Sequence, residues 1–245
     1  MQVKRTFVVV FILAALMLTA LAVPMSVQAK SEEPSVRSVE GVTCTLPESD
    51  AEALVILSNY YPSRYYWDHT DLTIAIQAHP NTTDEQLEAL HAAIDAWNDV
   101  LLECFDGLIT LTDVTDTTLN AQKADIVVHF VPHAGGAFFA GYAICAVGGC
   151  PNILVRSENP PAWGSATYDP QLVEWIAMHE IGHALGLGHA TNLLESTDLM
   201  GYGWPNLGDP VLSQCDIDAL AFIFSWAIEG TDPEPPGAGP YVCSQ

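Results

Sequence analysis

The chain has 245 residues, of which 30 are acidic and only seven are Lys or Arg, so its formal net charge is -23 at pH 7. This charge argues against nucleic acid as a partner, because the phosphate backbone would be repelled. The length suits one domain with a substantial core and leaves too little chain for a second full domain.

The first 29 residues have the pattern of a secretory signal peptide. Lys4 and Arg5 precede an apolar run over residues 7–23, and Val27-Gln28-Ala29 offers small residues before a cleavage site. An uncleaved membrane anchor is the alternative, because the run is only slightly shorter than the ~20 residues of a spanning helix. We therefore expect a secreted, extracellular protein that does not associate with membranes unless this segment is retained as an anchor.

All six cysteines lie after this segment. An even number of cysteines in an exported chain indicates disulfide bonds, because compartments outside the cytoplasm are oxidising. The sequence leaves the pairing open, although Cys145 and Cys150 flank Gly148-Gly149 and are the best single candidate pair. We expect three disulfides in the mature chain.

The first predicted elements follow a polar region. Residues 30–64 contain scattered Ser, Glu and Pro with little periodicity, which favours an N-terminal extension or short leader, with ordered structure starting near Tyr65. Apolar side chains then alternate at Leu72, Ile74 and Ile76, so the first strand is predicted over residues 71–77. Thr83 can cap a long helix whose apolar residues recur at helical spacing to about residue 103.

Further strands and two helices are predicted downstream. Apolar patterns predict strands over residues 107–111, 125–131 and 152–156, and the glycine-rich stretch 135–149 predicts a strand and a turn. Asp169 and Pro170 suit the cap and first turn of a second long helix, which Gly186 would end. Ser213 can cap a last helix, and residues 229–245 form a Pro/Gly-rich tail.

Three of the eight histidines lie within eleven residues, in the segment His179-Glu180-Ile181-Gly182-His183-Ala184-Leu185-Gly186-Leu187-Gly188-His189. Residues four apart on a helix lie on one face, about 6 Å apart along the axis, so His179 and His183 can bind one metal ion. Gly186 can take a positive φ that ends the helix and lets His189 return as a third ligand. The segment therefore predicts a metal site with three histidine ligands.

The donor set indicates zinc. Three neutral imidazoles leave a fourth position for water, which is the arrangement of a catalytic rather than a closed structural site. Glu180 follows the first ligand directly and projects beside the pair, where it can act as general base toward that water. The hypothesis is hydrolysis of protein or peptide substrates. The many carboxylates also make calcium a possible second cofactor, although no EF-hand spacing is present. The sequence does not indicate the oligomeric state.

The segment matches every fixed position of the motif H-E-x-x-H-x-x-G-x-x-H, so the chain resembles the metzincin clan of zinc peptidases. Residues 124–126 and 212–218 are most similar to the matrixin, or matrix metalloproteinase-like, branch, and the resemblance covers roughly residues 71–226. It implies a metzincin-like (zincin) catalytic domain over residues 65–228. The implied fold class is α+β, with a twisted mixed sheet of about five strands and three helices, one of which carries the zinc motif.

The resemblance implies two more site residues. Metzincins carry a methionine turn beneath the zinc site, and Met200, eleven residues after His189, is the candidate for it. In astacins and serralysins a tyrosine two residues past this methionine stabilises the oxyanion, and Tyr202 has the same spacing. The alternative role for Tyr202 is an aromatic wall of the substrate site, together with Trp204 and Pro205.

The sequence also departs from the matrixin pattern. It lacks the His-x-Asp loop that holds a structural zinc, so only one zinc is predicted, and His129 and His133 stay unassigned. The cysteine-switch sequence is absent, although the Cys44 thiolate could still cap zinc in a latent form. A structural disulfide explains Cys44 equally well. The alternative function is a catalytically silent zinc-containing module that binds peptides or matrix, against which the intact Glu180 argues.

Overall fold

The computed structural model describes residues 42–59, 66–117, 123–132, 140–146, 149–158, 167–203 and 207–243. All of them belong to one unit that spans Arg37–Gln245. The predicted signal peptide lies outside the described residues. None of the helices that the structure describes is both long and apolar enough to cross a membrane.

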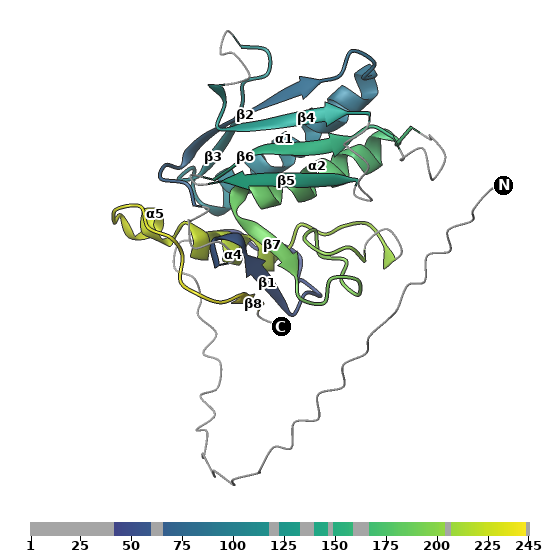
Figure 1. The fold of residues 1–245 in the computed structure, drawn as a ribbon. Coiled ribbons are helices and arrows are strands. Elements are labelled where there is room, and N and C mark those ends of the chain that lie inside the picture. Colours follow the sequence, from purple (N-terminus) through teal and green to yellow (C-terminus); the bar gives the residue numbers. More distant parts are fainter. Residues whose placement is uncertain are drawn as a thin grey trace, which may run out of the picture. The chain divides into compact units, whose positions relative to one another are not determined.

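A five-stranded mixed sheet forms the larger layer of the fold (Figure 1). The strand order is β3-β2-β4-β6-β5, in which β5 pairs antiparallel with β6 and the other neighbours pair parallel. This confirms the predicted α+β class and the mixed sheet of five strands. The strands are β2 (Asp71–Ala78), β3 (Thr110–Asp113), β4 (Ile126–Val131), β5 (Gly141–Ala146) and β6 (Gly149–Arg156).

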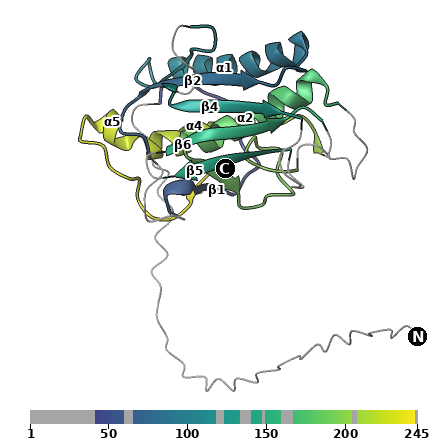
Figure 2. The same cartoon turned by 45° about the horizontal axis from the view of Figure 1, so that its top comes forward.

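Two long helices, α1 (Asp84–Cys104) and α2 (Pro170–Leu185), pack against each other and against one face of this sheet (Figures 1 and 2). The predicted Thr83 cap of α1 is present as a capping box with Gln86. Trp97 of α1 is fully buried, and its indole N–H donates to the Met178 carbonyl of α2 over 2.8 Å. This contact fixes the position of the helix that carries the histidine motif.

A second, three-stranded antiparallel sheet has the order β7-β1-β8, from β1 (Ala53–Ile56), β7 (Leu187–Ala190) and β8 (Tyr241–Val242). The prediction that the first strand begins at residue 71 is therefore wrong, because β1 precedes it, and the predicted tail contributes β8. Each strand is too short to show a period. These strands form only because parts of the chain that are distant in sequence pair with one another. The remaining helices are η1 (Leu57–Asn59), α4 (Gln214–Ile223) and the short α5 (Ser225–Glu229). Ser213 caps α4, as predicted.

Disulfides fasten both ends of the described chain. Cys44 is bonded to Cys104 of α1, and Cys215 of α4 is bonded to Cys243, which follows β8. Cys145 is also disulfide-bonded, but the side chain of Cys150 lies outside the described part, so their pairing stays a prediction. The idea that a Cys44 thiolate caps zinc is wrong, because its sulfur is in a disulfide.

Removal of the Cys44–Cys104 disulfide by alanine substitution of both residues is expected to lower the unfolding free energy by about 4 kcal/mol. The disulfide closes a loop with a sequence separation of 60, which restricts the unfolded chain. Removal of Cys215–Cys243, with a separation of 28, should cost slightly less. Denaturant unfolding of the metal-free proteins measures both losses, and the reverse order would contradict loop closure as the cause.

Candidate metal centre

Helix α2 and the turn after it bring the three histidines together. Asp169 caps the helix by accepting from the Leu172 N–H, and Pro170 opens it. Gly186 ends it with a φ of 111°, a value that a side chain disfavours, and the chain then enters β7, which carries His189. Ligand atoms of His179, His183 and His189 all lie within 4.8 Å of one another.

Backbone carbonyls fix the tautomers of the two helical histidines. His179 Nδ1 donates to the Leu199 carbonyl over 2.6 Å, and His183 Nδ1 donates to the Leu187 carbonyl over 2.7 Å. Because a carbonyl only accepts, both protons lie on Nδ1 and both Nε2 atoms carry a free lone pair. Burial lowers the pKa of His179 to about 4 and that of His183 well below its usual value, so both rings are neutral near pH 7.

The third histidine completes a set of donors suited to a cation. His183 Nε2 and His189 Nε2 are 3.1 Å apart, and the Tyr202 hydroxyl oxygen lies 2.6 Å from His189 Nε2. These two ring nitrogens therefore lie close enough together to bind one cation. His179 Nε2 is buried and has no hydrogen-bond partner among the described residues. The residues present therefore fit a metal ion of the kind that imidazole prefers.

Glu180 is buried beside this centre, with 4% of its surface exposed. Burial raises the pKa of its carboxyl well above the usual value, and Oε2 has no hydrogen-bond partner among the described residues. The backbone of Gly141, at the start of β5, lies directly against the carboxylate, since a Cβ there would be 2.5 Å from Glu180 Oε1. Sequence patterns did not indicate this contact, because the two residues are far apart along the chain.

The tyrosine and methionine predicted for the site both lie at it. Burial, and next the charge of Glu180, raise the pKa of Tyr202 to about 12, so its hydroxyl stays a neutral donor. Met200 is fully buried beneath α2, and its Sδ would be 2.6 Å from a Cβ on Gly182. Only a glycine at that position lets the methionine pack so closely under the histidine-bearing turn.

The other residues singled out in the sequence do not join this group. His129 on β4 contacts Asn152 of β6, with Nε2 and Oδ1 2.8 Å apart. His133, Trp204 and Pro205 lie outside the described residues. Within the ranges that the structure describes, the three histidines are the one group that could hold a metal.

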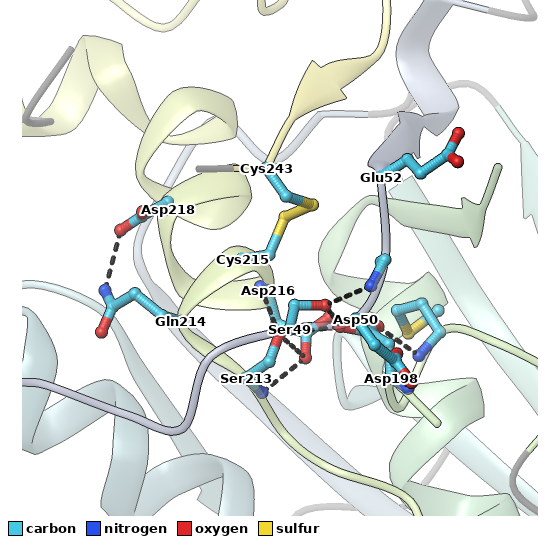
Figure 3. Close-up of a disulfide and its surroundings, with 12 residues drawn as sticks. Ser49, Asp50, Glu52, Asp198, Ser213, Gln214, Cys215, Asp216, Asp218 and Cys243 are labelled. Carbon is cyan, nitrogen blue, oxygen red and sulfur yellow. Dashed lines mark hydrogen bonds between the residues drawn. A yellow bond between two sulfur atoms is a disulfide. The ribbon is translucent and has the colours of Figure 1, made fainter. Parts of the chain in front are cut away.

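Two buried carboxylates, Asp198 and Asp216, support the loop beneath the histidines (Figure 3). Asp198 accepts from the Met200 N–H over 2.9 Å and from the Ser213 hydroxyl over 2.8 Å. Asp216 accepts from the Ser213 N–H over 2.8 Å. Burial, and next the charge of Asp198, raise the pKa of Asp216 well above its usual value.

This carboxylate pair predicts a loss of stability with rising pH. The native state keeps the Asp216 proton above the ordinary pKa of 3.8, where the unfolded state releases it. The unfolding free energy should therefore fall from that pH through the folded-state pKa, by up to about 1.4 kcal/mol per pH unit. The variant Asp216→Asn should lack this component, which denaturant unfolding of both metal-free proteins across pH 4–8 would measure. Parallel pH profiles would contradict the assignment.

Comparisons with known proteins identify the family of the chain. The matrixin family model matches residues 66–224. Interstitial collagenase of Sus scrofa is 28% identical over 200 residues, which cover 74% of this chain and 37% of that protein. Macrophage metalloelastase of Oryctolagus cuniculus is 27% identical over 192 residues, or 74% of this chain and 39% of that protein.

The solved structure of high choriolytic enzyme 1, a hatching enzyme zinc-protease from Oryzias latipes, is 14% identical and covers 70% of this chain and 97% of that chain, with a TM-score of 0.39. The chain spans less than half the length of the collagenase and the metalloelastase. Because the family model matches more than half of the chain and includes all three histidines, the chain belongs to the matrixin family.

Proposed function

We propose that this protein is a secreted, zinc-dependent endopeptidase that hydrolyses peptide bonds in protein substrates, with Glu180 as general base. The observation that supports it most is the convergence of three neutral imidazoles within 4.8 Å. Carbonyl acceptors direct the Nδ1 protons of His179 and His183 away from that point, so their Nε2 lone pairs are ready for a metal. Membership in a peptidase family supports the same reaction.

Zinc held by His179, His183 and His189 would act as a Lewis acid. It would lower the pKa of a bound water molecule and polarise the substrate carbonyl. The protein's own part is proton transfer. Glu180 is positioned to take a proton from the attacking water and to return it to the departing amine. Its raised pKa suits this role, since a carboxylate in an apolar setting binds a proton more strongly.

Tyr202 is the second residue to which we assign a role in the reaction. Its hydroxyl lies beside His189 and keeps its proton, because the pKa is raised to about 12. A neutral donor at this place can donate a hydrogen bond to the oxyanion that forms from the substrate carbonyl. Met200 has no polar role in this proposal and supports the histidines by packing under Gly182.

The sheet edge next to Glu180 suits an extended peptide. Strand β5 is the last strand of the five-stranded sheet, and its first residue, Gly141, contacts Glu180. A peptide that pairs with an edge strand gains backbone hydrogen bonds and places alternate side chains in contact with the protein. The exposed Tyr142 and Ile144 on β5 would be among the first residues that such a substrate meets.

Metal content and chelation test the proposed function. Purified mature protein should contain one equivalent of zinc and cleave an unfolded protein substrate. A chelator should abolish the cleavage, and added zinc should restore it. Protein without stoichiometric transition metal, or proteolysis that resists chelators, would refute the proposal. Bound zinc without turnover would instead support the catalytically silent binding module. Calcium binding stays a prediction that no contact among the described residues supports.

A further inference from the structure

Residues 49–57, named here the N-terminal bracket, pair with the strand that carries the third histidine. In this bracket β1 is antiparallel to β7, with Leu54 opposite Ala190 and Ile56 opposite Leu187. The bonds from Leu57 N–H to the Gly186 carbonyl, 3.0 Å, and from Thr191 N–H to the Ala53 carbonyl, 2.9 Å, extend the pairing beyond β7 at both ends. The Leu187 carbonyl orients His183, so β1 supports two of the three histidines.

The bracket also binds the loop that orients the remaining histidine. The Asp50 carboxylate accepts from the Ser196 hydroxyl over 2.6 Å, from the Thr197 hydroxyl over 2.8 Å and from the Thr197 and Asp198 N–H groups. The Ser49 hydroxyl donates to the Asp198 carboxylate (Figure 3). The next residue, Leu199, provides the carbonyl that accepts from His179.

The bracket is fixed in place by burial and by covalent anchors nearby. Leu54 and Ile56 are buried in the main core, at 0% and 1% exposure, so removal of the bracket would expose both side chains and the core beneath them. Cys44, five residues before the bracket, is bonded to α1, and β8 covers the other edge of β1. Burial of these two apolar side chains therefore stabilises the bracket in its place.

We propose that residues 49–57 remain attached in the working enzyme and hold all three zinc histidines in position, with Asp50 as the positioning residue for the loop beneath them. This inference rests on the proposed zinc-dependent function and adds its mode of maturation. Removal of a propeptide must stop before the bracket. Cleavage within residues 49–57 would weaken metal binding, so it would inactivate the enzyme rather than activate it. Substitution of groups that orient metal ligands commonly lowers metal affinity or activity by about 10–100-fold.

Zinc affinity of Asp50 variants tests the positioning role. Asp50→Asn, which keeps the shape, and Asp50→Ala should each bind zinc about 10–100-fold more weakly in competition with a chromophoric chelator. The cobalt-substituted variants should show altered visible d–d absorption, which a loss of stability alone would not change. Glu52→Gln is the matched control, because this exposed side chain two residues away points away from Asp198 in Figure 3.

The mature N-terminus provides a test that needs no variant. Mass spectrometry of active secreted protein should find the Cys44 peptide linked to Cys104 and residues 49–57 uncut. An active species that begins after residue 57 would overturn the inference. So would Asp50 variants with the zinc affinity and cobalt spectrum of the wild type. Both of these outcomes overturn the inference alone and leave the proposed function standing. A wild-type protein that binds no zinc would overturn the proposed function as well.

Discussion

Glu180→Gln is expected to lower kcat/KM on an unfolded protein substrate about 10²–10⁴-fold while the protein keeps its zinc. The glutamine amide has nearly the shape of the carboxyl but cannot accept a proton from water at the pH of the assay. Because Glu180 is not one of the three predicted metal ligands, the metal should remain bound. Zinc content and initial rates, measured on the same preparation, check both halves of this result.

Glu174→Gln on the same helix is the matched control, because it makes the same substitution six residues, or about 1.7 turns, away from Glu180. Its rate should equal that of the wild type. Glu180→Gln with full activity would show that another group moves the proton. Loss of zinc together with activity would assign Glu180 a role in forming the metal centre instead.

Local patterns explain what could be predicted of the fold and the site. Thr83, Asp169 and Ser213 cap α1, α2 and α4 at the predicted positions, because a cap acts within one helical turn. Two of the three histidines belong to α2 and the third to the short strand β7 that follows it directly, so their convergence could also be predicted. Their binding of zinc stays a prediction.

Contacts between distant segments explain what the sequence did not predict. Asp50 lies 147 positions from Thr197, and nothing near either residue predicts their pairing. β1 and β8 have four and two residues, too few to show a period. They form because β1 pairs with β7 on one side and with β8 on the other. Residues 30–64 are polar as a whole, and this hid the buried Leu54 and Ile56 inside them.

Gly141→Ala is expected to lower kcat about 10²-fold without loss of zinc. The new Cβ would lie 2.5 Å from Glu180 Oε1 and 2.7 Å from its Cγ, so the carboxylate must move. Displacement of a catalytic group by about 1 Å commonly costs about 10²-fold in rate. Gly141 is not among the glycines with positive φ, so alanine suits its backbone and the effect should come from this contact. Single-turnover kinetics and zinc analysis measure it.

A double-mutant cycle decides whether Gly141 acts through Glu180. If alanine at position 141 slows the reaction only by moving the base, then the double variant with Glu180→Gln should be no slower than Glu180→Gln alone. Additive losses would instead mean that Gly141 serves the substrate, for instance through the edge of β5 where a peptide would pair. Because Gly141 lies both at that edge and against the carboxylate, the coupling between the two substitutions measures how far one strand terminus positions substrate and base together.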